Sequence, residues 1–136
     1  MEKIILEPTE LTPGVKLDAA TNRYEMWGES RPENARKFYQ PILDWFDQLN
    51  KELYYLKSEA EEDVLKRTVE VKFSFDYLNS TSIKFVYELL KKISELKTNC
   101  SDVLVTWMYE PGDEDMKESG EEYSNMVDVK FNIKSK

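Results

Sequence analysis

Residues Thr68 to Lys84, which read TVEVKFSFDYLNSTSIK, decide the fold and contain the candidate site. The first eleven of these residues alternate apolar and polar side chains, which is the period of a β-strand with one buried face. The alternation stops at Leu78, and the polar run 79–82 follows it. From Ile83 onward the apolar residues recur at helical spacing. The stretch therefore predicts a strand that passes directly into an amphipathic helix.

The same two periods recur on either side of this stretch. Strands are predicted at 3–7, 15–18, 23–27, 68–78, 103–109 and 127–133. Helices are predicted at 32–57 and 81–96, with a short acidic loop and helix at 113–126. The predicted fold class is therefore α/β (α+β). It is a single domain over 1–136, in which two main helices and one short helix pack on a mixed sheet of about five to six strands.

Local signals add finer expectations. Gly28 is expected to end its strand, and Ser30, with Glu33 three residues later, forms a capping box that would begin the first helix. Pro41 removes one backbone hydrogen bond inside that helix, which predicts a kink or a restart. The acidic segment 58–66 is interpreted as a mobile connector. The buried stripe of the second helix is expected to comprise Ile83, Val86, Tyr87, Leu90 and Ile93.

Composition narrows the classes of function. The net charge is −8, from 27 acidic and 19 basic residues, and no basic stripe compensates it. Binding to nucleic acid or to an anionic membrane is therefore disfavoured.

Histidine is absent, which excludes His-based catalytic triads and zinc sites. Cys100 is the one cysteine, so no intramolecular disulfide can form. No signal peptide or membrane span begins within Met1 to Leu6, so we expect a cytoplasmic protein. We also expect no cofactor.

The run Asn79-Ser80-Thr81-Ser82 lies where the strand passes into the helix. Its simplest role is helix capping, because Asn, Ser and Thr are all favoured caps. A helix amino-terminus also presents unpaired N–H groups and a partial positive charge, so a phosphate added there would be stabilised. Lys84, one helical turn further on, could contribute to stabilising the phosphate. The residues leave both interpretations open: a cap with no further role, or a site of reversible phosphorylation.

The acidic segment 113–122 suggests a different class of protein. Carboxylates can bind Ca²⁺ or Mg²⁺, so a small metal-dependent enzyme is one alternative. The spacing does not match a calcium-binding loop, which favours a solvated acidic loop instead. An unmodified scaffold is a second alternative. No catalytic residue and no metal ligand is predicted.

Two motifs resemble the SiaC family of bacterial regulatory phosphoproteins. Gly28 to Asn34, followed by Phe38-Tyr39, is similar to the family's G-[DE]-S-x-P-E-N segment. Tyr77 to Lys84 is similar to its Y-L-N-[TS]-[ST]-S-x-K segment. Weaker similarity extends over Leu11-Thr12-Pro13, Trp107-Met108-Tyr109, 113–115 and 120–123. The resemblance therefore spans nearly the whole chain.

The resemblance implies a STAS-like fold, as in anti-sigma-factor antagonists, and a non-enzymatic regulatory role. It implies that a protein kinase phosphorylates the hydroxyl after the motif's Asn and that a PP2C-type phosphatase removes the phosphate. The unphosphorylated form would bind and activate a diguanylate cyclase and so raise cyclic di-GMP. The acceptor expected here is Ser80, with Thr81 as second choice. The residues expected around the phosphate or a partner are Asn79, Thr81, Ser82 and Lys84. The sequence predicts no oligomeric state.

Overall fold

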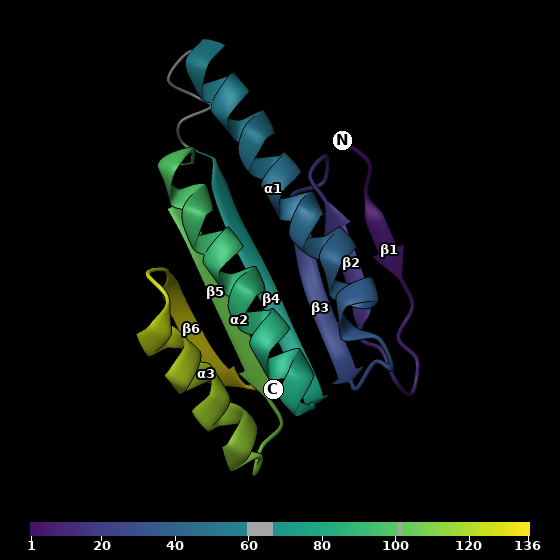
Figure 1. Ribbon diagram of the computed structural model, residues 1–136. Helices are drawn as coiled ribbons and strands as arrows, with labels where there is room; N and C mark the ends of the chain where they lie inside the picture. The colour runs from purple at the N-terminus through teal and green to yellow at the C-terminus, as the bar shows by residue number, and fades with distance from the viewer. Residues whose placement is uncertain (60–66, 101) are drawn as a thin grey trace.

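The computed structural model describes residues 1–59, 67–100 and 102–136, which form six strands and three α-helices (Figure 1). The strands are β1 (Ile4–Leu6), β2 (Gly14–Asp18), β3 (Arg23–Ser30), β4 (Thr68–Leu78), β5 (Asp102–Tyr109) and β6 (Lys130–Ser135). The helices are α1 (Ala35–Glu59), α2 (Ser80–Glu95), which continues as a 3₁₀ turn (Leu96–Thr98), and α3 (Glu114–Met126). The predicted mixed α/β fold is confirmed.

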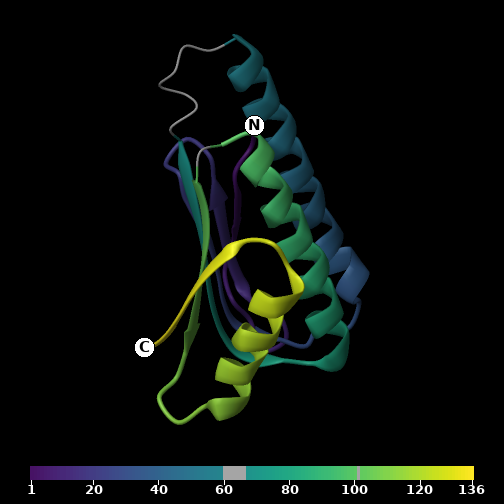
Figure 2. The same ribbon diagram turned by 90° about the vertical axis from the view of Figure 1, so that its left-hand side faces the viewer.

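All six strands belong to one sheet, in the order β1-β2-β3-β4-β5-β6. The first three strands pair antiparallel, and β3 to β6 pair parallel. Each parallel pair is joined by a helix, and the three helices lie on the same face of the sheet (Figure 2). The molecule therefore has two layers, and the carboxyl ends of β3, β4 and β5 each lead into the start of a helix.

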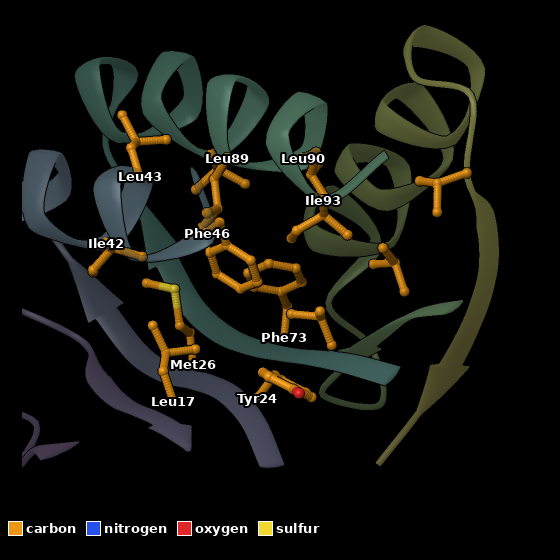
Figure 3. Close-up of a cluster of buried hydrophobic side chains, with 14 of the residues drawn as sticks. Leu17, Tyr24, Met26, Ile42, Leu43, Phe46, Phe73, Leu89, Leu90 and Ile93 are labelled. Carbon is orange, nitrogen blue, oxygen red and sulfur yellow. The ribbon is translucent and has the colours of Figure 1, made fainter. Parts of the chain in front are cut away.

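The core lies between the helix layer and the covered face of the sheet (Figure 3). Apolar side chains from β2, β3 and β4 meet those from α1 and α2 there. The largest that are almost fully buried include Leu17, Tyr24, Met26, Phe46, Phe73, Leu89 and Trp107. On the opposite face of β4 the alternation places polar residues such as Lys72 and Ser74, which the helices do not cover. The strand's two faces thus follow its sequence pattern.

The structure corrects two expectations about the segment before α1, the helix cap and the end of the strand. Helix α1 begins at Ala35, and its cap is Asn34, whose Oδ1 accepts a hydrogen bond from the Lys37 amide at 3.1 Å. The predicted cap, Ser30, is instead the buried last residue of β3. Strand β3 continues through Gly28, because glycine tolerates the positive φ of 96° found there. The helix also continues through Pro41 without a restart.

The buried face of α2 is rotated from the predicted stripe. Val86, Leu90 and Ile93 are buried as expected. Ile83 is 44% exposed and Tyr87 is only half-buried, while Phe85 and Leu89 are buried in their place. In the predicted connector, positions 58 and 59 belong to α1. The rest of it, 60–66, lies outside the described residues.

No helix in the described part of the chain is both long enough and apolar enough to cross a lipid bilayer.

Candidate functional site

Ser80 is the first residue of α2, immediately after the carboxyl end of β4. Its side chain and that of Thr81 are both exposed. The abrupt change from strand to helix follows from the sequence, since the apolar alternation of β4 ends at Leu78 and a capping residue comes next. Both candidate acceptor hydroxyls therefore lie at the surface beside a helix amino-terminus.

Asn79 caps this helix. Its Oδ1 accepts a hydrogen bond from the Ser82 amide at 2.8 Å, and its backbone oxygen accepts one from the Ile83 amide at 3.0 Å. In the described part of the chain, the amides of Ser80 and Thr81 have no protein acceptor. These two N–H groups and the partial charge of the helix end are available to an anion at the surface.

Ser82, one of the residues expected around the phosphate or a partner, has a fully buried side chain. Ser82 Oγ donates to the backbone oxygen of Ser30 at 3.1 Å and lies 2.8 Å from Ser30 Oγ. Ser30 Oγ is hydrogen-bonded in turn to the Tyr39 hydroxyl at 2.6 Å. We call Ser30, Tyr39 and Ser82 the hydroxyl network, which joins β3, α1 and α2 beneath the exposed hydroxyls.

Burial raises the pKa of the Tyr39 phenol, and hydrogen bonds from Ser30 and Ser82 offset only part of this effect. The phenol therefore stays protonated and neutral through the physiological range. The hydroxyl network thus brings no charge into the core, which is consistent with a structural role.

Basic side chains lie near the start of α2 although the whole chain is acidic, and one of them, Arg31, also pairs with Glu29 at 3.3 Å. Lys84 is exposed one turn after Ser80. The Arg31 guanidinium lies 4.5 Å from the ring centre of Tyr77, and the Arg36 guanidinium lies 4.9 Å from that of Phe85. Arg31 follows Ser30, whose oxygen accepts the Asn79 amide, so this cation comes from the strand end next to the cap. Negative charge added here would meet nearby positive charge.

A register shift exposes Tyr77 beside the site. Pairing between β3 and β4 slips after Gly28, so that Glu29 faces Tyr77 rather than Asp76. The slip reverses the alternation of β4, which brings Leu78 inward and leaves Tyr77 43% exposed. Sequence reasoning missed Ser30, Tyr39 and Arg31 as neighbours of the site. Periodicity carries no signal for them, because β3 and β4 are distant in sequence.

The acidic segment forms the start of α3. Asp113 caps the helix, with its Oδ1 accepting from the Met116 amide at 3.1 Å, and Glu114 and Asp115 lie in the first turn. Acidic residues are favoured there by the helix dipole. Within 1–59, 67–100 and 102–136, no three acidic, Cys or His side chains gather as a metal ion would require. Helix capping therefore accounts for Asp113 to Asp115.

Sequence comparison finds similarity over nearly the whole chain. The profile of a family described as SiaC family regulatory phosphoprotein matches residues 6–136. An uncharacterized protein of Pseudomonas aeruginosa strain UCBPP-PA14 is 25% identical over 135 residues, which are 99% of this chain and 98% of that protein.

Solved structures share the fold. SiaC of Pseudomonas aeruginosa matches with a TM-score of 0.78 at 23% identity, with 100% of both chains covered. A crystal structure of the diguanylate cyclase SiaD in complex with its activator SiaC, from the same organism, matches with a TM-score of 0.79 at 24% identity. That match covers 98% of this chain and 99% of the other. With a family profile that spans nearly all of it, the chain belongs to the SiaC family of regulatory phosphoproteins.

Proposed function

We propose that this protein is a non-enzymatic regulator whose binding to an effector is controlled by phosphorylation of Ser80. The observation that carries the proposal is the position of Ser80, exposed at the first residue of α2. A kinase can reach such a hydroxyl without unfolding the domain. The buried hydroxyl network holds the backbone beneath it, so the acceptor is presented from a fixed position.

The charge of a phosphate suits this position. A phosphoserine carries about −1.5 to −2 charges at neutral pH, and a helix amino-terminus stabilises that charge. Lys84 is four residues on, the spacing at which helical side chains meet. The modification is therefore expected to change the surface and leave the fold intact. Thr81 is also exposed and remains the second choice of acceptor.

The proposed effector is a diguanylate cyclase. The support is that SiaC of Pseudomonas aeruginosa, which shares the fold, occurs in a crystal structure as the activator bound to the diguanylate cyclase SiaD. The unphosphorylated form of the present chain would bind and activate its cyclase in the cytoplasm. A protein kinase would switch this binding off, and a PP2C-type phosphatase would restore it.

Phosphorylation would oppose binding through desolvation. If the start of α2 lies in the interface, a dianion there must lose water or separate the surfaces. A penalty of about 3 kcal/mol lowers affinity roughly a hundredfold. Ser80→Asp is expected to weaken cyclase binding, and Ser80→Ala is expected to keep it, with melting temperatures close to wild type in both cases.

Intact-mass measurement on protein purified from its own host tests the switch directly. The expected result is a fraction heavier by one phosphate, which disappears in Ser80→Ala and persists in Thr81→Ala. Loss of the heavier fraction only in Thr81→Ala would move the acceptor to Thr81. Labelling that survives both substitutions would refute an acceptor at the start of α2.

A further inference from the structure

A groove of about 440 Å³ lies between α2 and α3. It is lined by five residues of α2 between Ile83 and Lys91 and by four residues of α3 between Ser119 and Met126. On each helix these positions recur three or four residues apart, so one face of each helix forms a wall. At 1.5 Å per residue, the α2 wall from Ile83 to Lys91 is about 12 Å long, which is roughly two helical turns.

Both walls of the groove carry an exposed apolar side chain. Ile83 is 44% exposed and Met126 is 56% exposed, although both belong to regular helices. Between them the Tyr123 hydroxyl donates to the Ile83 backbone oxygen at 2.7 Å, which holds α3 against α2 at this point. A partner that covered the exposed part of either side chain would remove apolar surface from water, which favours binding.

The two walls differ in charge. The α2 wall carries Lys84 and Lys91, with Glu88 between them. The α3 wall belongs to a helix with five acidic residues and one lysine, of which Glu122 lines the groove. A ligand that fills the groove therefore meets net positive charge along one side and negative charge along the other. That arrangement selects both the sequence and the orientation of what binds.

The walls also select the secondary structure of the ligand. Both are helices, so their backbone groups are already paired internally and offer no edge to which an extended peptide could add as a strand. A helix satisfies its own backbone hydrogen bonds and presents a stripe of side chains at positions i, i+4 and i+7. Two turns of such a helix match the length of the groove.

We propose that this groove binds one amphipathic helix of the effector. Its apolar stripe would cover Ile83 and Met126, with acidic side chains toward α2 and basic side chains toward α3. This inference rests on the proposed function, which supplies a cyclase as effector, and it names the surface that the effector contacts. The groove and Ser80 adjoin, because Ile83 and Lys84 are in the first turn and a half of the helix that Ser80 begins.

This position explains how one phosphate could control binding. A phosphate on Ser80 would attract Lys84, which is four residues away on the same helix, and so compete with the acidic flank of the bound helix. It would also place its own negative charge at the end of the groove toward which that flank extends. Repulsion by the phosphate and the loss of Lys84 as a partner would both weaken binding of the effector helix.

The test compares two groove variants, Ile83→Glu and Met126→Glu, with the control Ile5→Glu. Ile5 is 50% exposed and lies on β1, at the far end of the sheet from α3, so the control adds the same charge at a similarly exposed isoleucine. The probe is the full-length diguanylate cyclase that co-purifies with the tagged wild-type chain from its own host. Affinity is measured by calorimetry, and cyclic di-GMP formation is followed in the same samples.

We expect each groove variant to lose at least tenfold in affinity and to lose cyclase stimulation, while Ile5→Glu behaves as wild type. Melting curves check that all three variants are folded. If the cyclase binds the groove variants as tightly as wild type, the groove is not the docking site and the proposed function stands. If no cyclase co-purifies with wild type, the proposed function fails and the inference fails with it.

A photo-crosslinking residue at position 126 tests the form of the ligand. Crosslinks to cyclase positions spaced three or four residues apart are expected from a helix. Crosslinks spaced two residues apart would indicate an extended segment and overturn the proposed occupant.

Discussion

Ser30 connects three elements through its two oxygen atoms. Its backbone oxygen accepts hydrogen bonds from the Asn79 amide at 2.9 Å and from Ser82 Oγ at 3.1 Å. Its side-chain oxygen is hydrogen-bonded to the Tyr39 hydroxyl. All three hydroxyl side chains are fully buried, so water cannot replace a lost partner. The hydroxyl network therefore fixes where α2 begins, and with it the position of Ser80.

Ser82→Ala is predicted to lower the free energy of unfolding by about 1 to 3 kcal/mol, because it removes two buried hydrogen bonds, one to each oxygen of Ser30. Ser80→Ala is the matched control in the same turn. Its side chain is exposed, so the expected change is within about 0.5 kcal/mol. Urea unfolding measures both. Equal effects of the two substitutions would contradict a structural role for Ser82.

Asn79→Ala is predicted to destabilise the protein by about 1 kcal/mol, because it removes the hydrogen bond that Asn79 Oδ1 accepts from the Ser82 amide. Asn79→Asp should keep most of the stability, because a carboxylate is an equally good cap and its charge suits the helix end. Chemical denaturation of the three proteins side by side gives the comparison. A loss in Asn79→Asp as large as in Asn79→Ala would show that the cap is not the source of the effect.

Local sequence predicted some of these residues correctly and others incorrectly. The start of α2 was predictable because a strand period, a run of capping residues and a helix period follow one another without a gap. The roles of Ser30 and Ser82 were not, since each serine lies within five residues of a helix start and its local sequence fits a capping or surface role equally well. Only the pairing of β3 with β4 brings them together and buries them.

At the scale of the element, helix α2 shows why the buried face of a helix can be predicted at the wrong rotation about the helix axis. The predicted set and the observed set share Val86, Leu90 and Ile93. The predicted set is completed by Ile83 and Tyr87, whereas the observed set is completed by Phe85 and Leu89. Both choices have helical spacing, so periodicity cannot separate them. Contact with α1 decides, because Phe85 stacks on Tyr39 with ring centres 5.4 Å apart. Ile83 is thereby turned toward α3 and the groove.

Gly120 sets how closely α3 approaches the sheet. A Cβ atom added there would lie 2.4 Å from Cδ1 of Trp107, which is buried and donates its indole N–H to the Met116 oxygen at 2.9 Å. Gly120→Ala would ordinarily stabilise a helix interior by up to about 1 kcal/mol. Here overpacking should reverse the sign and destabilise by about 1 to 3 kcal/mol.

The exposed position Asn125 provides a control for Gly120→Ala in the same helix. Asn125→Ala should leave the free energy of unfolding within about 0.5 kcal/mol of wild type or raise it slightly. Thermal melting distinguishes the two outcomes. A stabilised Gly120→Ala protein would mean that α3 can move away from Trp107 without cost.

For the whole molecule, the sequence predicted the class of fold better than the surface. Polar residues on one face of β4 and apolar ones on the other predict a sheet covered on one side, as observed (Figure 2). The sequential strand order then places the helices side by side in chain order. The groove between α2 and α3 could not be predicted, because it depends on how far apart two helices settle on the sheet. Tyr123 holds α3 against α2 and Gly120 lets α3 approach the sheet closely, both through contacts distant in sequence.

The stability of the whole molecule should fall in alkaline solution. Burial raises the pKa of the Tyr24, Tyr39 and Tyr123 phenols and of the Cys100 thiol. In the unfolded chain these groups titrate near their ordinary pKa values, 10.0 for the phenols and 9.0 for the thiol. The native state therefore holds these protons more tightly. Their contribution to stability is complete below pH 9 and declines as the pH rises through 9 and 10 toward the folded pKa values.

Tyr123→Phe separates this effect from general alkaline damage. The substitution removes one titrating group, so the decline in the free energy of unfolding above pH 10 should be shallower by up to about 1.4 kcal/mol per pH unit. It also removes the bond to the Ile83 oxygen, so slopes are compared rather than absolute values. Tyr54→Phe makes the same chemical change at an exposed tyrosine and serves as the control. Urea unfolding at several values between pH 8 and pH 11 gives the slopes. Identical slopes in all three proteins would show that Tyr123 does not couple its proton to folding, because a phenol that titrates alike in both states adds nothing to the dependence on pH.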